Sequence, residues 1–117
     1  MVVLLELGFR FLWLKQPILK AGIEDPHFHH RLPPNSDQRF LSDEFDVTTR
    51  TNRYGLRGPD PVIPKPSGTI RLLMLGDSFT FGFPVKDDET FVSRIEQGLR
   101  ARDYPVEVVN GGVSGYS

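Results

Sequence analysis

The chain has 117 residues, of which 38% are hydrophobic and 25% charged, and it contains no cysteine. These proportions are ordinary for a globular protein, and the length allows one small domain. The formal net charge of −1 gives no reason to expect nucleic acid as a partner, and the absence of cysteine excludes disulfides and thiolate metal sites.

The first segment, residues 1–15 (MVVLLELGFRFLWLK), is rich in large apolar side chains that Glu6 and Arg10 interrupt. A spanning helix needs roughly 17–25 mostly apolar residues, and a signal peptide has a basic start and a cleavage site of small residues. The segment fits neither pattern as written. Three interpretations stay open: an amphipathic or partly buried helix, the end of a membrane anchor that begins upstream, or an interfacial helix, which Trp13 and Lys15 would suit.

Residues 16–68 are predicted to be rich in loops. Prolines leave no periodic pattern in residues 16–42, which predicts an irregular surface segment. Residues 45–51 (FDVTTRT) contain β-branched side chains in rough alternation and predict a short strand. Residues 52–58 (NRYGLRG) have turn chemistry, and the proline-rich residues 59–68 predict a linker or a loop along a sheet edge. Three arginines of this region could contact an anionic substrate, but in a turn-rich stretch they are expected to be solvated or packed on a neighbouring domain: Arg50, Arg53 and Arg57.

The linker divides the chain into an N-terminal extension, residues 1–68, and a second part, residues 69–117. Residues 70–75 (IRLLML) form a nearly continuous apolar run, as expected of a strand buried on both faces of a parallel sheet. Residues 106–110 (VEVVN) predict a second strand, which follows the helix breaker Pro105.

A helix is predicted over residues 87–102, between these two strands. Its apolar face rests on three residues spaced by four and one beside them: Phe91, Ile95, Leu99 and Val92. Asp87 or Asp88 is the expected N-cap. Strand, helix and strand in this order predict a right-handed βαβ unit with parallel strands.

A serine follows the first of these strands, in residues 76–82 (GDSFTFG). The carboxyl ends of strands in open parallel sheets are where ligands bind. Gly76 would permit a tight turn that exposes the hydroxyl of Ser78, and the N–H groups that follow would stabilise an oxyanion. The position suits a nucleophile, although the tripeptide alone favours a turn or helix-capping serine. These residues are not expected to form a phosphate-binding loop, because they lack the lysine and the glycine spacing of such loops.

Two strings in this region resemble the conserved blocks of the GDSL/SGNH hydrolases. Residues 72–83 (LLMLGDSFTFGF) resemble the first block, in which the serine of Gly-Asp-Ser is the nucleophile. Residues 108–117 (VVNGGVSGYS) resemble the second block, in which a glycine after the strand lends its N–H to the oxyanion hole; by position this is Gly115. Residues 51–60 (TNRYGLRGPD) resemble, more weakly, a segment that precedes the hydrolase domain in bacterial members.

The resemblance implies a flavodoxin-like three-layer α/β/α domain, of which residues 69–117 would contribute the first βαβ unit. It implies a serine esterase or acyl hydrolase that needs no metal and no organic cofactor. Ser78 would be the nucleophile, and the backbone N–H groups of Ser78 and Gly115 would stabilise the oxyanion. Asp77 would organise the turn.

Acylated small molecules, lipids or carbohydrates are the implied substrates, and an exported or membrane-anchored location is slightly favoured. The alternatives are an acyltransferase that acts on carbohydrate hydroxyls and a non-catalytic binding or docking module.

Two further blocks of the family, Gly-x-Asn-Asp and Asp-x-x-His, do not occur in the sequence. Asn110 lies before the second-block glycine and is not expected to act as the oxyanion asparagine. His27, His29 and His30 lie among prolines far upstream, so a solvated loop is favoured over a metal site or a substitute base. We therefore expect a truncated sequence that is inactive by itself, with strand faces left uncovered.

Overall fold

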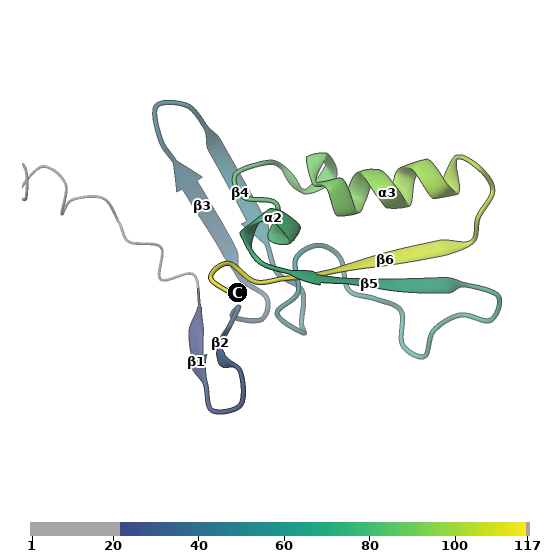
Figure 1. Cartoon of the computed structure of the whole chain (residues 1–117), viewed down its shortest axis with the longest axis horizontal. Helices are drawn as coiled ribbons and strands as arrows, with labels where there is room; N and C mark the ends of the chain where they lie inside the picture. The colour runs from purple at the N-terminus through teal and green to yellow at the C-terminus, as the bar shows by residue number, and fades with distance from the viewer. Residues whose placement is uncertain (1–21, 117) are drawn as a thin grey trace, which may run out of the picture.

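The computed structural model describes residues 22–116, which form a small mixed α/β domain (Figure 1). Along the chain the elements are β1 (Ile23–Asp25), β2 (His29–Arg31), β3 (Asp37–Leu41), β4 (Asp46–Arg50), β5 (Ile70–Gly76), α2 (Ser78–Phe81), the 3-10 turn η1 (Asp87–Glu89), α3 (Phe91–Arg100) and β6 (Val106–Gly112). The predicted helix in residues 1–15 lies outside the described residues. Within residues 22–116, no helix has the length and apolarity that crossing a membrane requires.

The strands form three two-stranded sheets. β1 pairs with β2 and β3 with β4 in antiparallel hairpins, whereas β5 and β6 are parallel, with Leu72 opposite Val108. α3 connects β5 to β6 and packs along β6 (Figure 1). The two strands predicted in the second part of the chain, and their parallel pairing, are therefore present.

The prediction of an irregular segment over residues 16–42 is wrong for the part that the structure describes, because β1, β2 and β3 all fall within it. These strands carry little sequence signal, since β1 and β2 have three residues each and β3 is largely polar. These strands form because each pairs with a neighbouring strand. In the β3–β4 pair, Phe40 lies opposite Val47, and both side chains are buried. The strand predicted over residues 45–51 is observed as β4.

The predicted helix is present as α3, but its cap and its buried face differ from the prediction. Thr90 is the N-cap, and its Oγ1 accepts a hydrogen bond from the N–H of Ser93 at 3.1 Å. Val92 is only 3% exposed, whereas Phe91 is 44% exposed. A two-stranded sheet covers one narrow stripe of the helix, so most of the apolar face predicted from the spacing stays in contact with solvent.

β5 is also more exposed than its sequence predicts. Leu73 and Leu75, which point to the same side of the strand, are exposed, as is Leu72 on the other side. The prediction of a strand buried on both faces is wrong for the described residues, because α3 packs chiefly on β6. The expectation that two parallel strands and one helix leave apolar strand faces uncovered is confirmed.

The hydrophobic core crosses the predicted boundary between the extension and the second part. Leu32 and Phe40 come from the extension, whereas Phe81 ends α2 and Val113 follows β6. Phe83 lies edge-on to Phe40, with ring centroids 5.1 Å apart. The extension and the β5–β6 sheet therefore bury apolar side chains against each other.

β6 and α2 touch through their backbones at Gly112, where a Cβ atom would lie 2.1 Å from the nitrogen of Phe81. We expect Gly112→Ala to lower the free energy of unfolding by about 1–3 kcal/mol or more, because the added methyl group forces the backbones apart. Urea unfolding measures the change. Gly98→Ala is the control: its methyl group fits in α3 and should stabilise the helix by about 0.5–1 kcal/mol. An unchanged stability of Gly112→Ala would contradict the close approach.

Candidate active site

Ser78 lies on a short turn directly after β5. The carboxylate of Asp77 caps this turn by accepting a hydrogen bond from the N–H of Phe79 at 2.9 Å. Gly82 closes it in the left-handed region, with φ of 86° and its N–H donating to the carbonyl of Ser78 at 2.9 Å. Asp77 thus organises the turn through this cap. Ser78 is half-buried, and its Oγ forms no hydrogen bond with any other residue in the range 22–116.

Gly76 precedes the turn for a reason that the sequence analysis did not identify. Its φ does not lie in the left-handed region, so it is not required for an unusual backbone conformation. Instead, a Cβ atom at Gly76 would lie 2.2 Å from Oγ1 of Thr80. The glycine provides the space in which the turn folds back over the end of β5.

The loop after β6 lies beside this turn. The N–H of Val113 donates to the carbonyl of Gly76 at 2.9 Å and ties the ends of the two strands together. Gly115 follows in the left-handed region at φ of 90°, where glycine is favoured. The N–H groups of Ser78 and Gly115 donate to no acceptor in the described part of the chain, so both are available to a ligand.

The side chain of Asn110 links β6 to α2. Its Nδ2 donates to the carbonyl of Thr80 at 2.9 Å, and its Oδ1 accepts from the N–H of Gly112 at 3.0 Å. The side chain is buried and occupied by these contacts. Asn110 therefore holds α2 against β6.

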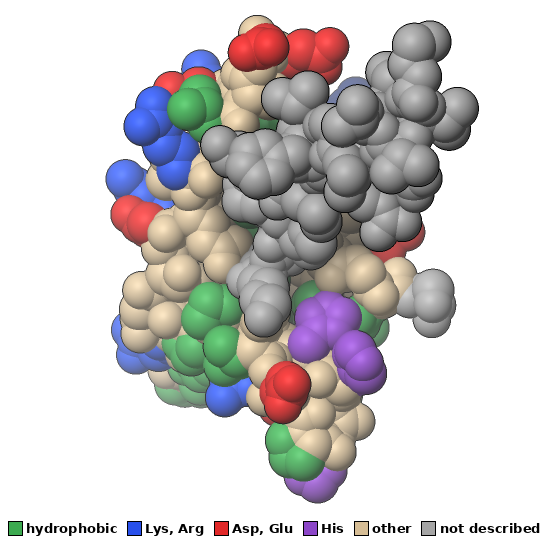
Figure 2. Space-filling model, turned by 90° about the vertical axis from the view of Figure 1, so that its left-hand side faces the viewer, with side chains coloured by type: hydrophobic (Ala, Val, Ile, Leu, Met, Phe, Trp, Pro, Cys, Tyr) green, Lys and Arg blue, Asp and Glu red, His purple; other side chains and the backbone are tan. Residues whose placement is uncertain are grey.

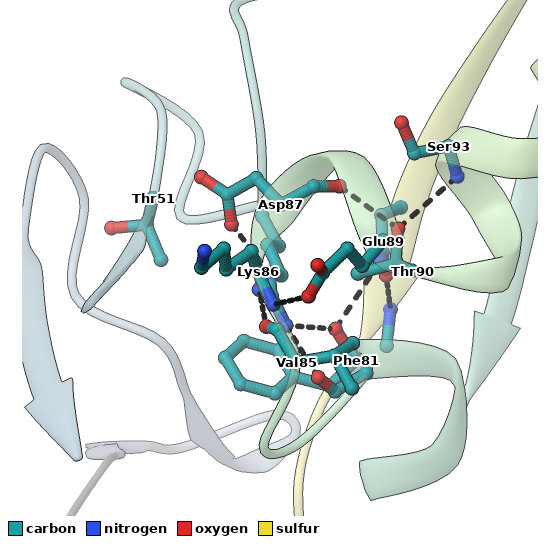
Figure 3. Close-up of polar contacts among 12 residues, drawn as sticks. Thr51, Phe81, Val85, Lys86, Asp87, Glu89, Thr90 and Ser93 are labelled. Carbon is teal, nitrogen blue, oxygen red and sulfur yellow. Dashed lines mark hydrogen bonds and ion pairs between the residues drawn. The ribbon is translucent and has the colours of Figure 1, made fainter. Parts of the chain in front are cut away.

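Arg57 holds the segment that follows α2, and sequence reasoning did not separate it from the other arginines of the extension. Its side chain is 2% exposed and donates to the carbonyls of Phe81 at 2.7 Å, Gly82 at 2.8 Å and Val85 at 2.6 Å. Figure 3 shows Phe81, Val85 and Asp87 in this network, with the hydrogen bonds as dashed lines. Its Nε also pairs with Asp87 at 2.8 Å, and the guanidinium lies 4.9 Å from the Phe81 ring centroid. The planar guanidinium thus satisfies backbone acceptors that would otherwise be buried without donors.

The turn around Arg57 is itself tightly built. Asn52 is buried, and its Oδ1 accepts from the N–H groups of Tyr54 at 2.9 Å and Leu56 at 3.1 Å. The backbone N–H and the guanidinium of Arg53 lower the pKa of Asp60 from its usual value. The asparagine and glycines of residues 52–58 were the sequence signal for this turn, whereas no local pattern indicated that Arg57 is buried.

The β1–β2 hairpin reaches the loop that carries Gly115. Nε2 of His30 lies 2.9 Å from the carbonyl oxygen of Ser114, and its ring lies edge-on to Tyr116. A carbonyl can only accept, so Nε2 of His30 carries a proton. Nδ1 of His30 also lies 3.0 Å from Nδ1 of His29, so one of these two nitrogens donates a hydrogen bond to the other. The expectation of a solvated loop is wrong for His30, because it packs against the loop after β6.

A cavity of about 1020 Å³ lies between the hairpin and the turn that carries Ser78. It is lined by Gly22, Glu24, Asp25, Pro26, His29, His30, Leu32, Phe40, Ser78, Phe83 and Ser114. Figure 2 shows histidine side chains in the lower half of its view, in two separate places. In the range 22–116, no three His, Asp or Glu side chains converge closely enough to hold a metal ion. The structure thus brings His29 and His30 to the same cavity as Ser78, although they lie far apart in the sequence.

Comparison with known protein families and with curated proteins finds no match to this chain.

We expect Arg57→Ala to lower the free energy of unfolding by about 3–5 kcal/mol, because the variant leaves buried carbonyls and Asp87 without their donor. Urea denaturation followed by circular dichroism measures the loss. Arg53→Ala is the matched control, since the Arg53 side chain is exposed and its loss should change stability far less. Equal losses in the two variants would contradict a special role for Arg57.

Proposed function

We propose that the chain is part of a serine hydrolase of the GDSL/SGNH type, with a flavodoxin-like α/β/α domain and Ser78 as its nucleophile. The observation that carries the proposal is the placement of Ser78 just past a parallel strand, on a capped turn and at the edge of a cavity. The exposed apolar side chains of β5 support a larger, layered sheet, because parallel sheets are normally covered on both faces.

In the proposed reaction, Oγ of Ser78 attacks the carbonyl carbon of an ester while its proton passes to a base. The negative charge that develops on the carbonyl oxygen is stabilised by the N–H groups of Ser78 and Gly115. Expulsion of the protonated alcohol leaves an acyl-enzyme, which water hydrolyses to the free acid. An acyltransferase would follow the same first half and replace water by a second hydroxyl group.

The base is the part of the proposal that the described residues do not supply. His29 and His30 line the same cavity as Ser78, but neither ring forms a hydrogen bond with its Oγ. His30 is also occupied by the carbonyl of Ser114. We therefore assign the base to an Asp-x-x-His pair, which the resemblance implies and residues 1–117 do not contain.

A fluorophosphonate probe tests the nucleophile in the full-length gene product. We expect the probe to label the wild-type protein and the Ser114→Ala variant, and to leave Ser78→Ala unlabelled, because only an activated serine reacts with it. Ser114 is the matched control, since it lines the same cavity. A non-catalytic binding module would remain unlabelled in all three proteins.

The 117-residue chain tests the assignment of the base. We expect it to hydrolyse p-nitrophenyl acetate at close to the rate of its own Ser78→Ala variant, because Ser78 contacts no base among the described residues. Release of p-nitrophenolate measures the rate. Ser78-dependent hydrolysis that disappears in His29→Asn would place the base on the β1–β2 hairpin and contradict the expectation.

A further inference from the structure

The loop that follows β6 is a tight turn whose central peptide unit joins Ser114 to Gly115. The N–H of Tyr116 donates to the carbonyl of Val113 at 3.2 Å and closes the turn, and Gly115 has φ of 90°. A positive φ at the third of four turn residues is typical of a type II turn. The peptide bond is trans, so its carbonyl and its N–H point in opposite directions. The carbonyl of Ser114 and the N–H of Gly115 therefore turn together as one rigid group.

The local sequence does not fix which way this peptide unit faces. Rotating it by about half a turn converts a type II turn into a type I turn, and glycine adopts the backbone that either turn requires at this position. The two turns present the N–H of Gly115 in opposite directions. A contact from outside the turn can therefore select one of them.

His30 of the β1–β2 hairpin makes such a contact. Its Nε2 carries a proton and lies 2.9 Å from the carbonyl oxygen of Ser114, and its half-buried ring lies edge-on to Tyr116, with centroids 4.9 Å apart. A Cβ atom at Gly115 would lie 3.6 Å from Cε1 of His30, so the ring lies against the peptide unit. The N–H of Gly115 consequently points away from His30, and it meets no acceptor within residues 22–116.

Both ends of the turn are held as well. Val113 is buried, and its N–H donates to the carbonyl of Gly76 in β5 at 2.9 Å. At the other end, the hydroxyl of Tyr116 lies within hydrogen-bonding distance of the carbonyls of Phe28, at 3.0 Å, and His30. The turn is thus attached to β5 at its start and to the hairpin at its end, and the hydrogen bond from the His30 ring sets the peptide unit between them.

From this geometry we infer that His30 is a positioning residue, which orients the N–H of Gly115 for the oxyanion although its own ring forms no hydrogen bond with Ser78. This role rests on the proposed function, which makes Gly115 an oxyanion donor. Donors that are already oriented lower the barrier, because they need not turn while charge develops on the substrate oxygen. The N-terminal extension thereby contributes to the reaction through one hydrogen bond, without supplying a reacting group.

Turnover of p-nitrophenyl acetate by the full-length gene product tests the role of His30. We expect His30→Leu to lower kcat by about ten- to hundredfold, because a misdirected N–H forfeits part of the roughly 10²–10³ that one oxyanion donor contributes. KM should change by less than about twofold, since the donor acts mainly on the developing charge. His30→Gln should keep kcat within about threefold of the wild type, because the amide Nε2 of glutamine donates from a similar position.

His27→Leu is the matched control for these variants. His27 belongs to the turn of the same hairpin, is exposed and does not line the cavity. Its kcat and KM should equal those of the wild type. Urea unfolding of each variant establishes that it is folded under the assay conditions, so that a loss of kcat reports on the site and not on the amount of folded protein.

The amide signal of Gly115 in 1H–15N spectra of the 117-residue chain reports the orientation of the peptide unit without any substrate. We expect one sharp signal in the wild type and in His30→Gln. In His30→Leu the signal should shift or broaden, because the peptide unit then exchanges between two directions. The signal of Gly98, which lies in α3, is the internal control and should be the same in all three proteins.

The outcomes separate this inference from the proposed function. Ser78-dependent hydrolysis with an unchanged kcat in His30→Leu would overturn the inference and leave the hydrolase in place, as would a Gly115 signal that does not respond to this variant. Equal losses of kcat in His30→Leu and His30→Gln would also overturn it, because glutamine retains the donor. If Ser78 is neither labelled by the fluorophosphonate probe nor needed for hydrolysis, the proposed function fails and the inference fails with it.

Discussion

The buried guanidinium of Arg57 is the contact on which the arrangement around Ser78 depends. It donates to the carbonyls of Phe81, Gly82 and Val85 and pairs with Asp87, so one side chain holds the whole segment between α2 and α3. These carbonyls are turned away from water, and a buried acceptor without a donor is costly. Because Arg57 belongs to the extension and the carbonyls belong to the second part, the two regions are joined by directional hydrogen bonds as well as by apolar contact.

Glycines set the distances between the loops that Arg57 and Asn110 hold. Gly76 lets Thr80 approach the end of β5, and Gly112 lets the backbone of β6 lie against Phe81. Asn110 of β6 then reaches α2 through its hydrogen bond to the carbonyl of Thr80, while its Oδ1 accepts from the N–H of Gly112 in its own strand. The position of Ser78 thus follows from close backbone packing, which only residues without a side chain allow. The contact of His30 with Ser114 places the β1–β2 hairpin against the loop that contains Gly115.

Local patterns were reliable where a segment forms its own structure. The apolar runs before Gly76 and Asn110 predicted β5 and β6, and the turn residues around Ser78 predicted a tight turn. They were unreliable where a partner decides the outcome. β1, β2 and β3 are too short or too polar to show a strand pattern, and they exist because each pairs with a neighbour. The N-cap of α3 is Thr90 and not one of the predicted aspartates, because Asp87 pairs with Arg57.

The sequence by itself determined the parallel β5–β6 pair with its connecting helix and the turn that carries Ser78, because these depend on hydrophobic pattern, turn chemistry and residues close together in the chain. Only the tertiary structure decided that Arg57 is buried, that the β1–β2 hairpin reaches the loop of Gly115, and that Glu24 and Phe83 share a cavity with Ser78. Each of these contacts joins segments far apart in the sequence. Their formation depends on packing and on the direction of single hydrogen bonds, which leave no periodic signal in the chain.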